Sequence, residues 1–79
     1  SFDIDGLSVE YCPNTGTPVA GGLSFNQAVY LLQEVVRSGR RIIGFDVVEV
    51  VARPESRLDA STGARILYKL CGLTIKSDV

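Results

Sequence analysis

Apolar residues recur at three- and four-residue steps along segment 25–36, which is the spacing of one face of an α-helix. Just before it, Ser24 and Gln27 have the form of a capping box, in which the serine hydroxyl accepts from the Gln27 amide and the glutamine side chain reaches back. Gly39 follows the last apolar turn and offers a C-terminal cap. The pattern predicts a helix between Ser24 and Gly39. Its apolar positions are Phe25, Ala28, Val29, Leu32, Val35 and Val36.

Two other segments have the character of β-strands. Segment 42–50 is almost continuously apolar and rich in β-branched residues, which is typical of a parallel-sheet strand covered on both faces. A shorter strand is expected around Phe2 and Ile4, and Gly6 ends it. The following segment 6–22 is rich in Gly, Pro, Asn, Ser and Thr, so it predicts an ordered loop, and long loops in compact domains are usually functional.

A second helix is predicted from about Asp59 to Cys71, with Gly72 just past its end. Its expected buried positions are Ala64, Leu67, Leu70 and Cys71. Strand, crossover helix, strand and helix then form a right-handed βαβα unit. Two parallel strands leave their outer edges unpaired, and covering the second on both faces needs more strands and helices than 79 residues supply. We therefore expect an α/β fold that is one piece of a larger domain, with the natural chain starting upstream of Ser1.

Charge and composition argue against two classes of binding partner. Eight basic and nine acidic residues give a net charge of −1, so we expect neither a nucleic-acid nor a membrane partner. The longest apolar run is interrupted by Asp46 and Glu49 and is far shorter than the roughly 20 residues of a membrane span. The two cysteines, Cys12 and Cys71, match no zinc motif, and we expect both to be reduced and buried.

Three acidic side chains are expected at one edge of the sheet. Asp3 and Asp5 end the first strand, and alternate residues of an ideal strand share a face with Cα atoms roughly 6.5–7 Å apart. Glu49 lies near the same end of the second strand, outside which ligands gather in open parallel sheets. Three acids without histidine suit Mn²⁺ or Mg²⁺ better than zinc. An unrelated Asp-x-Asp phosphotransfer domain would instead need a lysine at a neighbouring strand end, whereas Lys69 and Lys76 lie in or after the last helix.

Three separated blocks of the chain resemble the ureohydrolases, the family of arginase and agmatinase. They are residues 3–7 (Asp-Ile-Asp-Gly-Leu), 13–24 (Pro-Asn-Thr-Gly-Thr-Pro-Val-Ala-Gly-Gly-Leu-Ser) and 44–50 (Gly-Phe-Asp-Val-Val-Glu-Val). The blocks stand in the family order with the right helix between them, so the chain resembles the C-terminal segment of the family's single catalytic domain. It departs from the usual pattern at Ser8-Val9, where the family often has Asp-Pro, and at Val51-Ala52, where it often has Asn-Pro.

This resemblance implies a three-layer α/β/α sandwich with a parallel sheet and a dinuclear manganese centre, two Mn²⁺ per full active site, at the strand ends. Asp3 would bridge both ions and Asp5 would bind one of them, with the remaining ligands outside this chain. Glu49 would be the catalytic residue that pairs with the substrate guanidinium, and Thr17 would bind substrate beside it. The implied reaction is metal-assisted hydrolysis of a guanidino C–N bond to urea and an amine. Residues 1–79 by themselves are expected to be inactive.

The resemblance also implies a small-molecule guanidino substrate, contact with the rest of the catalytic domain, a cytoplasmic location and assembly as a homo-oligomer. The identity of the guanidino compound stays open, because the residues that recognise its tail come largely from other segments. An alternative is a non-catalytic family member, in which the fold serves assembly or regulation. Upstream histidine and aspartate ligands would separate the two hypotheses, since a binding module need not keep them.

Overall fold

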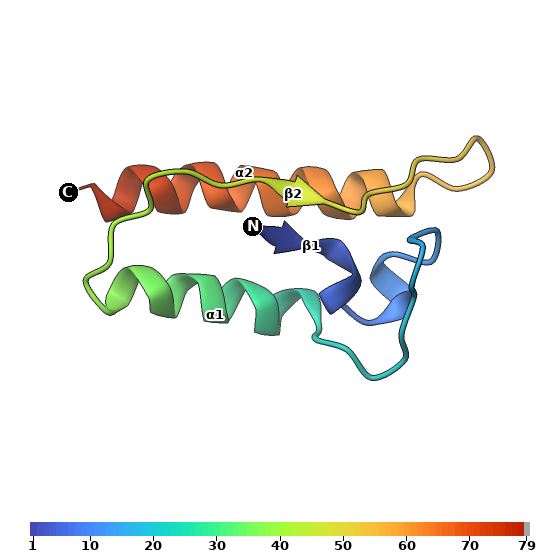
Figure 1. Cartoon of the computed structure of the whole chain (residues 1–79), viewed down its shortest axis with the longest axis horizontal. Coiled ribbons are helices and arrows are strands. Elements are labelled where there is room, and N and C mark those ends of the chain that lie inside the picture. Colours follow the sequence, from blue (N-terminus) through green and yellow to red (C-terminus); the bar gives the residue numbers. More distant parts are fainter. Residues whose placement is uncertain (79) are drawn as a thin grey trace.

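The computed structural model describes residues 1–78, and its elements follow the predicted order of strand, helix, strand and helix (Figure 1). The two strands are adjacent and parallel, with Phe2 opposite Val47 and Asp3 opposite Val48. This order confirms a βαβ crossover within an α/β fold. The elements are β1 (Phe2–Asp3), 3₁₀ helices η1 (Ile4–Gly6) and η2 (Val9–Tyr11), α1 (Phe25–Arg37), β2 (Val47–Val48) and α2 (Leu58–Ser77).

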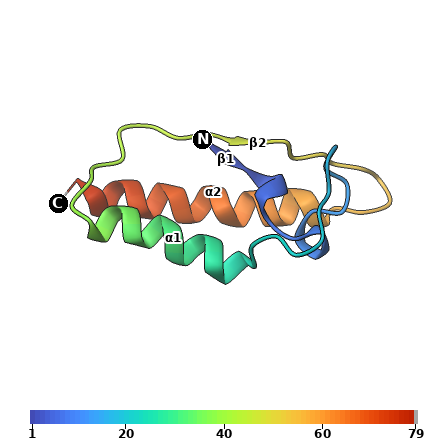
Figure 2. The ribbon, with the colours of Figure 1, turned by 60° about the horizontal axis from the view of Figure 1, so that its bottom comes forward.

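Both α-helices lie on one face of the two strands, as Figures 1 and 2 show together. The helices run side by side in the same direction, opposite to that of the strands. The opposite face of the second strand segment is open: Ile43 is 91 % exposed and Val48 36 %. Residues 1–78 therefore form a flat two-layer unit, which measures 41 × 24 × 15 Å along its principal axes.

Helix α1 begins and ends where the sequence predicts. The Ser24 hydroxyl accepts a hydrogen bond from the Gln27 amide at 3.1 Å, and the Gln27 Oε1 accepts one from the Ser24 amide at 2.9 Å, so both halves of the capping box form. Beyond the C-terminal end, Gly39 has a φ of 90°, a left-handed conformation that glycine adopts without steric cost. Ala28 and Val29 are the buried residues of this helix.

Helix α2 is longer than predicted. It continues to Ser77, so Gly72 lies inside the helix rather than after its end. The Ser77 hydroxyl accepts a hydrogen bond from the Ile42 amide at 3.0 Å, and Arg41 forms an ion pair with Asp78 at 2.8 Å. These contacts hold the last turns in place and offset the cost of a glycine in a helix, about 1 kcal/mol.

The buried face of α2 also differs from the prediction. Of the positions expected to be buried, Leu70 is buried, whereas Leu67 is 45 % exposed and Ala64 and Cys71 are exposed. The close approach of Gly63 to the second strand segment explains the difference, because a Cβ at Gly63 would lie 3.0 Å from a methyl carbon of Val50. Apolar residues occur on both sides of this helix, so the sequence alone left its orientation ambiguous. The buried residues are Asp59, Thr62, Gly63, Ile66 and Leu70.

The second strand is much shorter than the predicted segment 42–50. Its ladder contains Val47 and Val48, and the Phe2 amide adds one hydrogen bond to the Asp46 carbonyl at 2.9 Å. The physical reason is that a strand needs a partner, and β1 offers a ladder of two residues. Within residues 1–78 the helices cover one face of this segment, in line with the expectation that 79 residues are too few to cover both faces.

Two clusters of buried side chains form the core. One cluster joins the start of the long loop to α1, and the other joins the two helices beneath the strands. Cys12 is free and buried as predicted, whereas Cys71 is free but exposed, contrary to the prediction. Among residues 1–78, no helix combines the length and apolar character needed to cross a membrane. The clusters consist of Ile4, Leu7, Cys12 and Ala28, and of Val29, Ile66 and Leu70.

Candidate functional site

Asp3 and Glu49 lie at the carboxyl ends of two directly paired strands. Asp3 is the last residue of β1 and pairs with Val48, and Glu49 follows immediately after β2. The long loop and the connection from β2 to α2 lie at this same end of the molecule (Figure 1). The parallel pairing thus places both acids on the edge where ligands of open parallel sheets bind.

Asp5 does not continue the strand, contrary to the ideal-strand expectation. It lies in η1, and its amide donates a hydrogen bond to Asp3 Oδ1 at 3.1 Å, so the Asp3 side chain caps this turn. The two carboxyl groups still interact, and a side-chain hydrogen bond with Asp5 raises the pKa of Asp3 above its usual range. The ion pairs within residues 1–78 lie elsewhere, at the C-terminal ends of α1 and α2. Two neighbouring carboxylates without a cationic side chain favour a bound cation.

This donor set fits part of a site for a hard cation. Carboxylate oxygens suit Mn²⁺ and Mg²⁺. However, residues 1–78 contain no group of three or more His, Cys, Asp or Glu side chains that could hold an ion, and the sequence contains no histidine. The assignment of Asp3 and Asp5 as metal ligands therefore stays a prediction, and other segments would have to complete such a centre.

Thr17 contacts one of these acids directly. Its hydroxyl donates a 2.6 Å hydrogen bond to Asp5 Oδ2 across a separation of 12 residues. The resemblance described above predicts that Thr17 lies beside the substrate, and this role stays a prediction. The two contacts are compatible, since a hydroxyl that donates one hydrogen bond still has two lone pairs with which to accept others.

Glu49 has an unusual backbone conformation. It has a φ of 68°, the one positive value among the non-glycine residues in the described part of the chain. Such a conformation costs of order 1–3 kcal/mol and is found most often at functional sites. The Glu49 carbonyl accepts a 3.1 Å hydrogen bond from the Thr15 hydroxyl. The side chain of Glu49 is exposed at the strand end.

The sequence did not predict the hydrogen bonds that hold the long loop against the start of α2. The Asn14 amide donates to both carboxylate oxygens of Asp59 at 3.1 Å, and its side chain donates to the Ser56 carbonyl at 3.1 Å. The Thr62 hydroxyl donates to the Tyr11 carbonyl at 2.7 Å. Asp59 is completely buried, so the first turn of α2 holds the loop through a carboxylate shielded from water. An acid next to a predicted helix start was the available signal, but it is equally typical of an exposed helix terminus.

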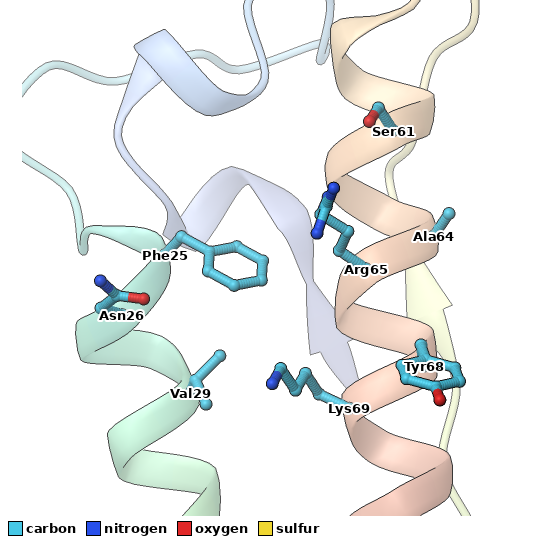
Figure 3. A pocket seen from close by; sticks show the side chains of 8 residues that line it. All are labelled: Phe25, Asn26, Val29, Ser61, Ala64, Arg65, Tyr68 and Lys69. Carbon is cyan, nitrogen blue, oxygen red and sulfur yellow. The ribbon is translucent and has the colours of Figure 1, made fainter.

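A hollow of about 540 Å³ lies between the two helices, away from the acids (Figure 3). Lys69 extends from α2 into this gap toward α1, and Arg65 lies along the side of α2. None of the predicted site residues lines the hollow, so the acids form an exposed edge and not a wall of this cavity. Its lining consists of Phe25, Asn26, Val29, Ser61, Ala64, Arg65, Tyr68 and Lys69.

The chain is similar to proteins of one known family. The family model described as "Arginase family" matches residues 1–72. Arginase-1 of Oryctolagus cuniculus is 46 % identical over 50 residues, which cover 63 % of this chain and 15 % of that protein. N(1)-aminopropylagmatine ureohydrolase of Thermus thermophilus is 39 % identical over 74 residues, which cover 92 % of this chain and 24 % of that protein. No solved structure matches the chain.

The matches extend over most of this chain but over a minor part of each relative. The chain spans 15 % of the length of the arginases and 24 % of that of the ureohydrolase. The family match contains Asp3, Asp5, Thr17 and Glu49 within its 72 residues. The chain belongs to the arginase family.

Proposed function

We propose that residues 1–79 are the C-terminal segment of the catalytic domain of a manganese-dependent ureohydrolase, which hydrolyses a guanidino C–N bond to urea and an amine. Family membership and the names of the relatives, Arginase-1 and aminopropylagmatine ureohydrolase, support this reaction class. The observation that carries the proposal is the strand-end edge. It combines the Asp3–Asp5 carboxyl pair with Glu49 in its left-handed backbone conformation.

In this proposal Asp3 and Asp5 would both be ligands of the two Mn²⁺ ions. The interaction with Asp5 that raises the pKa of Asp3 supports a cation there, because a positive ion offsets the repulsion between two neighbouring ionised carboxylates. Thr17 fixes the Asp5 carboxylate by its 2.6 Å hydrogen bond. When bound, Mn²⁺ supplies Lewis-acid activation of water and of the substrate.

Glu49 orients the substrate. A carboxylate forms paired, charge-assisted hydrogen bonds with a planar guanidinium, and such positioning contributes several kcal/mol to lowering a barrier. The Glu49 side chain is exposed, and both ion pairs of residues 1–78 use other acids, so its carboxylate is available to a cationic ligand. Thr17 lies beside the guanidinium in the same proposal.

The rest of the catalytic domain supplies the remaining metal ligands and the second helical layer of a three-layer sandwich. The open strand face with its exposed Ile43 and Val48 supports such a layer, because an apolar strand face gains stability when helices cover it. Residues 1–79 alone are then inactive, since they carry neither a histidine nor a complete ligand set among the described residues. The proposal includes a homo-oligomer of the full-length protein.

The test uses the full-length protein that contains this chain, loaded with Mn²⁺. Urea release is measured with arginine, agmatine and guanidine for the wild type and for Asp3→Asn and Glu49→Gln. We expect Asp3→Asn to lose bound manganese and activity together, and Glu49→Gln to lose activity with its manganese retained. Full activity in Asp3→Asn would sink the metal assignment. A wild-type protein that neither binds Mn²⁺ nor releases urea would favour the non-catalytic alternative.

A further inference from the structure

The strained backbone at Glu49 needs a structural cause. Glutamate gains nothing locally from a φ of 68°, in contrast to glycine or asparagine. Conformations of this kind persist only where the surroundings determine them. The contacts of the Glu49 backbone therefore show which residue holds the side chain at its place on the edge.

The contact that fixes this backbone comes from Thr15. The Thr15 hydroxyl donates a hydrogen bond to the Glu49 carbonyl oxygen at 3.1 Å, and Thr15 is only 4 % exposed. Loss of a buried hydrogen-bond partner costs about as much free energy as a left-handed conformation does. One such hydrogen bond can therefore offset the cost of the Glu49 conformation.

Two contacts of the loop fix the position of Thr15. Its amide donates to the Cys12 carbonyl at 3.3 Å, and the preceding residue Asn14 is clamped by the buried carboxylate of Asp59. Asp59 belongs to the first turn of α2, a long helix packed on the strands. A rigid element therefore sets the position of the Thr15 hydroxyl, and the hydroxyl sets the peptide that follows Glu49.

We propose that Thr15 is a positioning residue for Glu49: its hydroxyl holds the Glu49 backbone in the left-handed conformation that points the carboxylate at the guanidinium of the substrate. This inference rests on the proposed function, because it concerns how Glu49 meets that substrate. Thr15 acts through Glu49 and contacts neither the substrate nor the Asp3–Asp5 pair. Its removal should weaken substrate binding and leave the metal ions in place.

The chain offers a matched pair of substitutions in one loop. Thr15→Val removes the hydroxyl that faces Glu49, and Thr17→Val removes the hydroxyl that faces Asp5, with nearly the same change of shape. In the full-length protein with Mn²⁺, we expect Thr15→Val to raise KM for the accepted guanidino substrate about tenfold or more, with bound manganese per subunit unchanged. Thr17→Val should instead weaken manganese binding. Thr15→Ser keeps the hydroxyl and should restore KM.

A second readout does not depend on activity. Hydrogen exchange at the amides of Glu49 and Val50 is measured in the same full-length proteins, and we expect faster exchange in Thr15→Val and wild-type exchange in Thr15→Ser. Wild-type KM and wild-type exchange in Thr15→Val would overturn the inference, and so would a loss of manganese in that variant with KM unchanged. Should Thr15→Val fail to fold, Thr15→Ala answers the same question with a smaller side chain. A wild type without urea release counts against the proposed function, and exchange then still decides whether Thr15 holds Glu49.

Discussion

The Thr17 hydroxyl and the Asp5 carboxylate are joined by a 2.6 Å hydrogen bond that links the long loop to the strand-end acids. Partners of metal ligands typically contribute 10- to 100-fold to metal affinity. We therefore expect Thr17→Val to weaken Mn²⁺ binding by about 10- to 100-fold in the full-length protein, and Thr17→Ser to stay near wild type. Calorimetric titration with Mn²⁺ measures the affinities of both variants. Equal affinities in the Val and Ser variants would show that the hydrogen bond does not support the ligand.

Asp3→Asn should stabilise the metal-free protein at neutral pH while it removes a metal ligand. The neighbouring Asp5 raises the pKa of Asp3, so the folded state binds this proton more tightly than the unfolded state does. The contribution of Asp3 to stability is therefore complete below its unfolded pKa, about 3.9, and is lost as the pH rises through the folded value. The melting temperatures of the variant and of the wild type are compared from acid to neutral pH in chelator. We expect their difference to grow with pH, and a constant difference would contradict the coupling.

Cys12 and Cys71 should differ strongly in reactivity. Burial raises the pKa of the Cys12 thiol above its usual range, and the negative charge of Asp59 acts in the same direction. At mildly alkaline pH we expect alkylation of the exposed Cys71 first, with Cys12 reacting only after unfolding. Peptide mass spectrometry after timed alkylation measures the two rates. Because the folded pKa of Cys12 is raised, its contribution to stability is lost as the pH rises from about 8.5 through the folded value.

Gly22→Ala should destabilise the loop by overpacking. A Cβ at this position would meet the Leu7 carbonyl carbon and the Ser8 amide nitrogen at 2.8 Å, and backbone atoms cannot move aside as a flexible side chain can. We expect a loss of about 1–3 kcal/mol in the free energy of unfolding, measured with urea. Gly16→Ala is the matched control, because nothing lies within 4 Å of its new methyl group. Similar losses in both variants would contradict overpacking against Leu7 and Ser8 as the cause, because the Gly→Ala change in unfolded-chain entropy is itself stabilising.

Elements specified by neighbouring residues were predictable from the sequence. Helix α1 has its signals within its own segment, in the Ser24–Gln27 capping box and in Gly39, and it was predicted nearly to the residue. The end of α2 depends on distant Ile42 and Arg41, and its prediction failed.

The candidate site likewise has features that the sequence predicts and features that depend on contacts between distant residues. The acids Asp3, Asp5 and Glu49 were visible as strand-end residues, because acidic residues interrupt apolar segments there. The turn that holds Asp5 and the left-handed conformation of Glu49 were not visible. Both depend on hydrogen bonds to Asp3 and Thr15, and only the folded chain brings Thr15 to Glu49.

The pairing of Phe2 with Val47 also bears on the order of folding. Contacts that assemble the acidic edge join distant parts of the chain: Thr15 meets Glu49 over a separation of 34 residues, and Asn14 meets Asp59 over 45. Closing such long loops loses entropy before any contact forms, whereas α1 and α2 form from local contacts. We expect the helices to appear first and the edge last, so that partial unfolding would disperse the acids while most helical structure persists.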